Sequence, residues 1–202
     1  MAGPDFSEEL RLIEHGARVV AGIDEVGRGP LAGPVTAAAV ILDPDNIPKG
    51  LNDSKVLPAE ARERLFGELY ATSEVSVAHA SVEEIDTLNI LRASHLAMCR
   101  ALDGLRRTPC IALVDGNMIP EGLRCPGEAL IKGDGRSLSV AAASIVAKVV
   151  RDRIMVDLAQ QHPGYGWERN AGYPTKAHRE ALLSLGVTPY HRRSFKTVHN
   201  ML

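Results

Sequence analysis

The chain has 202 residues, of which 45% are hydrophobic and 24% charged, with a formal net charge of −2. This length suits one domain, or one domain with a small appendage, and leaves enough apolar residues to bury a core. The three cysteines show no CxxC or Cys/His spacing, which argues against a disulfide scaffold and against structural zinc, and favours a reducing cytoplasm. The longest apolar stretch, residues 140–150, contains Lys148 and is too short to cross a membrane.

The apolar pattern predicts a short first helix, capped by Asp5 and Glu8 and ending near Ala17. Two apolar strands follow, and the five glycines and prolines in residues 27–34 join them through a tight connection. In chain order, we expect strands at 18–24 and 35–42, a helix at 58–70, a strand at 74–80, a helix at 88–105 after a capping box at Ser81, strands at 110–114 and 129–131, and a helix from Ser137 to about Gln160.

Three early strands, followed by strands that alternate with helices, predict an α/β fold with a mixed sheet. The wholly apolar strand at 110–114 should lie inside this sheet, and the small residues at 141–144 should let the last long helix pack closely against it. The segment after His162 holds five of the eight aromatic residues, including Trp167, which we expect to anchor a core. We predict a catalytic core at 1–160 and a helical C-terminal extension at 161–202, both parts of one compact unit.

Charge is unevenly distributed along the chain. From Ala171 onward there are five Lys/Arg residues and one acid, whereas the preceding residues hold 18 basic and 24 acidic ones. A basic tail beside an acidic body suits a protein that holds phosphates at one place and cations at another. Chance patterning on a solvated surface would look the same.

Four acids follow predicted strands. Asp24 and Glu25 end the first strand, Asp115 ends the fourth, and Asp134 follows the fifth. Sites form at the carboxyl ends of strands in α/β sheets, and carboxylates gathered there repel one another unless a cation binds them. Mg²⁺ or Mn²⁺ prefers oxygen ligands, and two such ions about 3.5–4 Å apart assist phosphodiester hydrolysis. The alternative is that each acid caps a turn, as Asp-Gly pairs such as Asp115-Gly116 often do.

Residues 23–35, IDEVGRGPLAGPV, resemble the N-terminal signature of the ribonuclease HII family, the type 2 ribonucleases H. The similarity extends from about Val20 to Lys196. The matching segments are LNDSK at 51–55, VDGN at 114–117, KGD at 132–134, SVAAASIVAK at 139–148, RD at 151–152, GYPT at 172–175 and HRRSF at 191–195.

This resemblance implies a ribonuclease H-like mixed sheet flanked by helices, with a small helical C-terminal extension. It implies an endoribonuclease that acts on RNA–DNA hybrids and cuts 5′ of single ribonucleotides embedded in duplex DNA. Two-metal-ion hydrolysis would leave 3′-hydroxyl and 5′-phosphate ends. The catalytic and metal-binding residues carried over by position are Asp24, Glu25, Asp115 and Asp134, with Mn²⁺ or Mg²⁺ as the cofactor.

The resemblance also implies the substrate contacts. Backbone groups of Gly27, Arg28 and Gly29 would read the 2′-hydroxyl, which distinguishes RNA from DNA. Tyr173 would stack on the sugar of the following deoxynucleotide. Phosphates, which position a duplex without reading its sequence, would be held by Ser54, Lys55, Arg192 and Arg193. The expected partner is a hybrid or a ribonucleotide-containing duplex, and the expected form is a cytoplasmic monomer.

Other functions stay open at this point. A different polynucleotide-cutting enzyme with the same fold would cut all-DNA duplexes at a comparable rate. A glycoside hydrolase that uses two carboxylates would keep its activity after metal chelation. Asp24 and Glu25 point to opposite sides of a strand, which suits shared metal binding better than acid/base catalysis across a sugar. A non-catalytic hybrid-binding protein would normally have lost an acid. Around residue 152, we expect Asp152, Arg151 and Arg153 to form surface ion pairs and not a metal site.

Overall fold

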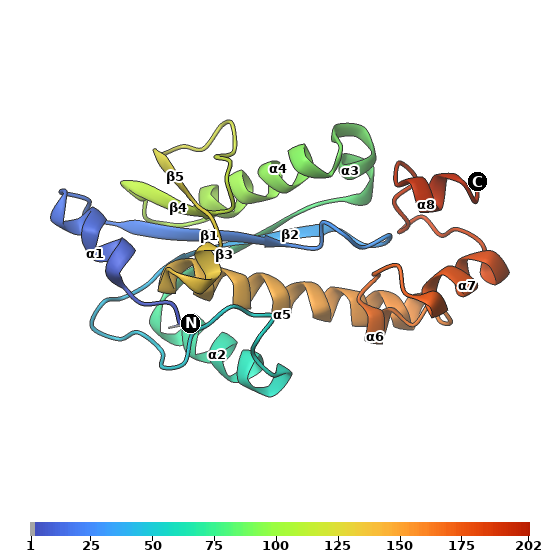
Figure 1. The fold of residues 1–202 in the computed structure, drawn as a ribbon, viewed down its shortest axis with the longest axis horizontal. Helices are drawn as coiled ribbons and strands as arrows, with labels where there is room; N and C mark the ends of the chain where they lie inside the picture. Colours follow the sequence, from blue (N-terminus) through green and yellow to red (C-terminus); the bar gives the residue numbers. More distant parts are fainter. Residues whose placement is uncertain (1–2) are drawn as a thin grey trace.

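Five strands form one mixed sheet in the order β3-β2-β1-β4-β5, in a computed structural model that describes residues 3–202 (Figure 1). Neighbours β1, β2 and β3 are antiparallel, whereas β4 and β5 run parallel to β1, so the predicted mixed sheet is confirmed. The strands are β1 (Val20–Val26), β2 (Val35–Ile41), β3 (Glu74–Ala80), β4 (Ile111–Asp115) and β5 (Gly127–Leu130).

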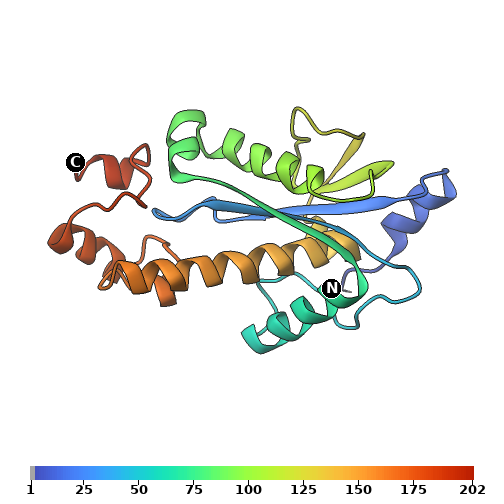
Figure 2. The same cartoon turned by 180° about the vertical axis from the view of Figure 1, so that it is seen from behind.

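Helices cover both faces of the sheet, as Figure 1 and the reverse view in Figure 2 show. Helices α3 (Val82–Leu88) and α4 (Ile90–Asp103) lie on one face, and α2 (Ala59–Thr72) and α5 (Leu138–Gln161) lie on the other. The remaining elements are α1 (Ser7–Glu14), the 3₁₀ turn η1 (Gly133–Gly135), α6 (Trp167–Asn170), α7 (Lys176–Leu185) and α8 (Lys196–His199).

Strand β1 shows how the alternation of side chains positions the acids. Ala21 and Ile23 belong to the core cluster that contains α4, so Gly22 and Asp24 point to the opposite face, toward α5. Glu25, the next residue, returns to the α4 side. One residue of register therefore decides which acid faces α5.

Helix α5 approaches β1 unusually closely at Gly22. A Cβ at this position would lie 2.1 Å from the backbone carbon of Ser139, so no other residue fits. The small residues at 141–144 are buried in the same layer, which confirms the predicted close packing of helix on sheet. This contact brings the N-terminal end of α5 next to the strand that carries Asp24.

The predicted capping pair of α1 differs from the structure. The N-cap is Phe6, and no side chain caps the helix. The Asp5 carboxylate instead accepts a hydrogen bond from the backbone N–H of Ser7 at 2.9 Å, and Glu8 pairs with Arg11 and Arg136. The helix begins one residue later than the predicted pair requires, so Glu8 is the second helical residue and not the third, and the reciprocal capping box does not form.

The helix expected at 88–105 begins later, at Ile90, because the backbone of Asn89 is not helical. Its φ of 71° separates α3 from α4, and its side chain accepts hydrogen bonds from the N–H groups of Leu91 and Arg92. The capping box at Ser81, in contrast, is present as predicted: Ser81 and Glu84 bond reciprocally at the start of α3.

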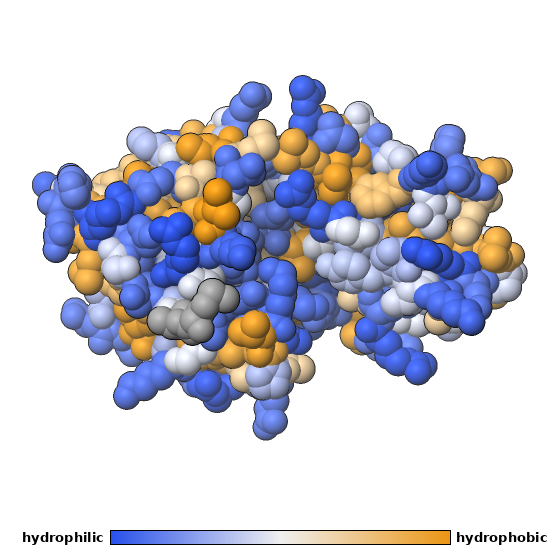
Figure 3. All heavy atoms as spheres, in the orientation of Figure 1, coloured by the Kyte–Doolittle hydropathy of each residue, from blue (hydrophilic) through white to orange (hydrophobic). Residues whose placement is uncertain are grey.

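The C-terminal helices pack on the end of α5 and on the glycine loop, residues 27–34. Their core contains Trp167, which is fully buried as predicted, together with Leu31 and Ala32 from the glycine loop and Met155 from α5. Hydrophilic side chains cover much of the face in Figure 3, with apolar residues scattered among them. Across residues 3–202, none of the helices has the length and apolar character needed to span a bilayer.

Candidate active site

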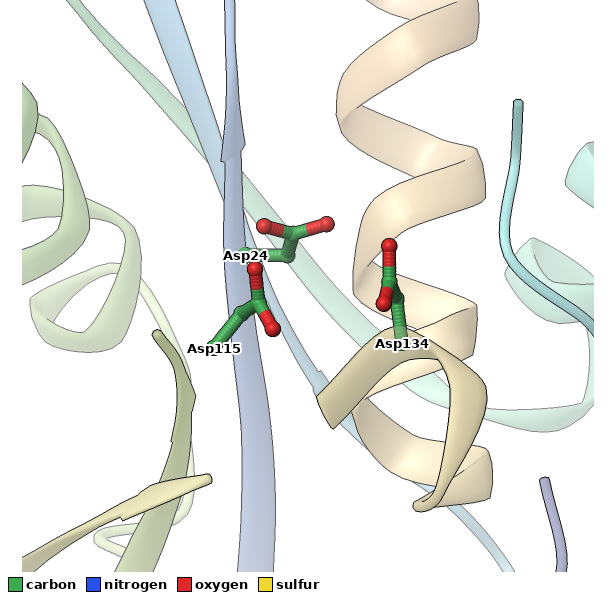
Figure 4. Close-up of side chains that lie close together, drawn as sticks. All are labelled: Asp24, Asp115 and Asp134. Carbon is green, nitrogen blue, oxygen red and sulfur yellow. The ribbon is translucent and has the colours of Figure 1, made fainter. Parts of the chain in front are cut away.

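Three carboxylates meet on the α5 side of the sheet, each from a different element (Figure 4). Asp24 lies in β1, Asp115 ends β4, and Asp134 lies in η1, just before α5. The parallel register pairs Ile23 with Val114, so the next residues, Asp24 and Asp115, are neighbours across the two strands. One oxygen from each acid lies within 4.8 Å of the others, so the structure brings these three predicted residues together.

Hydrogen bonds fix the acids in this arrangement. An oxygen of Asp115 accepts the backbone N–H of Gly133 at 2.7 Å, which ties the end of β4 to the turn that carries Asp134. Asp134 is only 6% exposed, and its Oδ2 lies 3.2 Å from the ammonium nitrogen of Lys55. Lys55 is therefore the nearest cation that balances the cluster.

Burial and repulsion between neighbouring carboxylates raise the pKa of two members of this cluster, Asp24 and Asp115. Burial raises the pKa of Asp24 well above its ordinary value, and the neighbouring carboxylates of Glu25, Asp115 and Asp134 raise it further. Burial and Asp134 likewise raise the pKa of Asp115. Burial alone would lower the pKa of Lys55, but the carboxylates of Asp134, Asp24 and Asp53 together outweigh burial and raise that pKa. The site thus concentrates negative charge that favours a cation.

Glu25 lies beside this triad but outside it. One of its oxygens accepts a hydrogen bond from Arg28 at 3.3 Å, and the other is buried with no hydrogen-bond partner in the described part of the chain. Burial raises the pKa of Glu25, although Arg28 partly offsets the effect. An unpaired buried carboxylate oxygen next to three more acids fits a hard divalent cation, which takes oxygen ligands.

The glycine loop is held from inside by Arg192, which is fully buried. Its guanidinium donates five hydrogen bonds of 2.6–3.2 Å to loop carbonyls. Burial lowers its pKa to about 9. The prediction that Arg192 holds a phosphate is therefore wrong, because its guanidinium has no access to solvent. The acceptors are the carbonyls of Gly27, Arg28, Pro30, Gly33 and Pro34.

A second buried arginine, Arg151, was not predicted in this role. It is fully buried and donates to the carbonyls of Pro34, Ala32 and Ala171 at 3.0–3.2 Å, so the expected surface pairing of Arg151 is wrong. Its neighbour Asp152 does form an ion pair, with Lys148 at 2.5 Å. The sequence signal is helical spacing, because Arg151 lies four residues from Ala147 and from Met155, which are both on the buried side of α5.

Of the other residues predicted to contact the substrate, three are exposed and one is buried. Lys55 and Arg193 are exposed, and Tyr173 is 43% exposed, with its ring 3.3 Å from where a Cβ on Gly29 would lie. Ser54, in contrast, is 4% exposed, and its hydroxyl oxygen accepts a hydrogen bond from Ser144 at 2.8 Å. In this structure Ser54 braces the segment that carries Lys55 and does not present its hydroxyl to solvent.

Replacing Gly27 with alanine is expected to cost about 2–5 kcal/mol of stability. Gly27 has a φ of 96°, and a Cβ there would lie 2.1 Å from Nε of Arg151. The matched control is Gly67→Ala in α2, where nothing lies within 4 Å of the added methyl group, and which should stabilise by roughly 0.5–1 kcal/mol. Urea unfolding of both variants measures the difference; equal stabilities would contradict the tight packing at Gly27.

Known structures share this fold. The crystal structure of ribonuclease H2 from Pyrococcus horikoshii OT3 superposes with a TM-score of 0.76 at 32% identity, covering 91% of this chain and 96% of that one. The sheet order and the carboxylates at its strand ends thus define a metal-binding nuclease with the ribonuclease H fold.

Sequence comparison narrows this class to one family. The Ribonuclease HII family model matches residues 21–198. Proteins named Ribonuclease HII from Ruegeria pomeroyi and Paracoccus denitrificans are each 69% identical over all 202 residues, which cover 86% and 96% of those relatives. The chain belongs to the ribonuclease HII family and is a ribonuclease H, a metal-binding endonuclease.

Proposed function

We propose that this enzyme hydrolyses the RNA strand of RNA–DNA hybrids and cuts 5′ of single ribonucleotides in duplex DNA, leaving 3′-hydroxyl and 5′-phosphate ends. The observation that carries the proposal is the position of the glycine loop. It follows β1 directly, so backbone groups suited to a 2′-hydroxyl lie within a few residues of Asp24 and against the ring of Tyr173. This proximity supports a site in which recognition of the ribose and hydrolysis of the adjacent phosphodiester take place side by side.

The hydrolytic centre consists of Asp24, Asp115 and Asp134, with Glu25 as the fourth proposed ligand. Divalent Mg²⁺ or Mn²⁺, bound as two ions, would supply an activated water and charge stabilisation for the leaving oxygen. Lys55, 3.2 Å from Asp134, neutralises part of the cluster and is exposed enough to meet a phosphate. The acids therefore bind cations while Lys55 orients the scissile backbone.

The orientation of the glycine loop explains how it reads a hydroxyl. In a trans peptide the carbonyl and the following N–H point in opposite directions. The carbonyls of Gly27 and Arg28 point inward to Arg192, so the N–H groups of Arg28 and Gly29 point away from it. Buried Arg192 thus presents two backbone donors to a ribose, although it never touches the substrate.

Three substrates test the proposal: a continuous RNA–DNA hybrid, a DNA duplex with one ribonucleotide, and the same duplex entirely of DNA. We expect cleavage of the first two and none of the third. Cleavage of all-DNA duplex at a comparable rate would contradict the ribonucleotide requirement and favour a general nuclease.

Tyr173→Ala is expected to lower cleavage of the single-ribonucleotide duplex by about tenfold and to affect the continuous hybrid less. The ring is 43% exposed beside the glycine loop, which supports its proposed stacking on the sugar of the next deoxynucleotide; stacking of a base on an aromatic ring, the comparable interaction, contributes about 1–3 kcal/mol. Steady-state kcat/KM on both substrates measures the effect. Equal losses on the two substrates would remove the proposed role of Tyr173 at the junction.

A further inference from the structure

Two imidazoles inside the C-terminal unit form a hydrogen-bonded chain that the hydrolytic mechanism does not use. His178 and His191 are both fully buried, and their Nε2 atoms lie 3.1 Å apart. On the outer sides, Nδ1 of His178 is 3.0 Å from the carbonyl of Tyr173, and Nδ1 of His191 accepts the N–H of Thr188 at 3.0 Å.

These partners determine the tautomer of each ring. A carbonyl only accepts, so His178 must carry its proton on Nδ1 and donate to Tyr173. Its Nε2 is then an acceptor, as the 3.0 Å hydrogen bond from the indole N–H of Trp167 requires. His191 accepts at Nδ1, so it carries its proton on Nε2 and donates to Nε2 of His178, whose one lone pair is shared between this N–H and that of Trp167. Burial lowers the pKa of both rings, that of His191 to about 4, which agrees with two neutral imidazoles.

The segments that carry the two imidazoles contact the two groups proposed to recognise the RNA–DNA junction, the glycine loop and Tyr173. On one side, the backbone that carries His191 forms an antiparallel bridge with the glycine loop at Ala32, while the ring itself bonds to Thr188. On the other side, His178 holds the carbonyl of Tyr173, whose ring lies against Gly29. The N–H of Leu31 also donates to the carbonyl of Gly172 at 2.8 Å. The imidazole pair therefore links the backbone of Tyr173 to the backbone segment, Thr188 to His191, that pairs with the glycine loop.

We propose that His178, oriented by His191, is a positioning residue that sets Tyr173 against the glycine loop and thereby supports recognition of the RNA–DNA junction. The inference rests on the proposed role of Tyr173. A hydrogen bond to the carbonyl fixes the backbone from which the ring projects, and the Thr188 and Trp167 donors prevent the imidazoles from rotating. Neither histidine touches the substrate.

The test compares kcat/KM on the single-ribonucleotide duplex with kcat/KM on the continuous hybrid. His178→Leu removes the donor to Tyr173 and should lower the ratio of the two by about two- to tenfold, the range for one lost hydrogen bond. His178→Asn keeps an amide N–H near the position of Nδ1 and should restore most of the ratio. The matched control, His162→Leu, changes another imidazole packed near Trp167, with ring centroids 6.1 Å apart, and should leave the ratio unchanged.

A double-mutant cycle separates positioning from general destabilisation. If His178 acts through Tyr173, His178→Leu should not change the ratio further in a Tyr173→Ala background. Independent, multiplying effects, or equal losses on both substrates, would overturn the proposal. If Tyr173→Ala alone leaves the ratio unchanged, the proposed function of Tyr173 is contradicted. If Tyr173→Ala changes the ratio and His178→Leu does not, only the positioning role of His178 is contradicted.

The tautomers of the two histidines can be measured in the parent enzyme, without any variant. In ¹⁵N-labelled parent enzyme at pH 7, imidazole nitrogen shifts should show His178 neutral with its proton on Nδ1 and His191 neutral with its proton on Nε2. The opposite tautomer at His178 would overturn the proposal, because that ring could not donate to Tyr173.

Discussion

Asp24→Asn is expected to abolish cleavage, lowering kcat by about a thousandfold or more, while duplex affinity changes by less than about twofold. Asp24 is 4% exposed and central to the triad, so an amide there removes a charge that the cation requires. The residues proposed to hold phosphates, Lys55 and Arg193, keep their positions. Single-turnover kinetics and a binding titration in the presence of Ca²⁺ measure the two effects separately.

The same substitution should stabilise the metal-free protein, raising Tm by roughly 2–6 °C. Burial raises the pKa of Asp24, Glu25 and Asp115, so the folded state retains protons that the unfolded state has lost. Metal-free stability should therefore fall as pH rises from the ordinary carboxyl range through the raised pKa values, and Asp24→Asn should reduce that fall. Asp152→Asn, at a surface acid paired with Lys148, is the control. Turnover near the parental rate in Asp24→Asn would rule out Asp24 as a metal ligand.

Arg192→Met is expected to destabilise the fold by about 3–5 kcal/mol and to abolish discrimination between RNA and DNA. Methionine fills much of the space of the side-chain stem but removes the Arg192 donor from five loop carbonyls, of which that of Pro34 keeps its hydrogen bond from Arg151. The backbone N–H groups of Arg28 and Gly29 then lose their fixed direction. Denaturant unfolding and the three-substrate assay measure the two losses.

The adjacent arginine provides a matched comparison. Arg193 is exposed, so Arg193→Met should change stability by less than about 0.5 kcal/mol. It should weaken binding to every duplex and reduce the salt dependence of log K by about one, as loss of one phosphate contact does. Similar stability losses in Arg192→Met and Arg193→Met would contradict the roles of Arg192 as a buried support of the glycine loop and of Arg193 as an exposed phosphate contact.

The positions of the acids could be predicted because they depend on local patterns. Apolar runs located the strands, and the period of two placed Asp24 on one face of β1 and Glu25 on the other. The parallel register of β1 and β4 then sets Asp24 beside Asp115. The order and direction of the strands thus bring acids that are distant in the sequence into one cluster. Glu25 lies outside the triad, where it accepts a hydrogen bond from Arg28.

The roles of the arginines could not be predicted in this way. Arg192 and Arg193 are adjacent and chemically identical, yet one is buried and the other exposed. What separates them is the glycine loop, more than 150 residues earlier in the chain, whose carbonyls bind the guanidinium of Arg192 and not that of Arg193. Local periodicity contains no information on such a distant partner. Asn89 is a similar case, because its positive φ interrupts a helical pattern that continues on both sides.

The most direct test of the account is the position and metal dependence of the cut in a DNA duplex that carries one ribonucleotide. The parent enzyme should cleave the phosphodiester 5′ of the ribonucleotide, with Mg²⁺ or Mn²⁺ and not with chelator, and leave a 3′-hydroxyl and a 5′-phosphate. Tight binding without any cut in either metal, or a cut that persists in chelator, would contradict a metal-dependent hydrolytic centre at Asp24, Asp115 and Asp134.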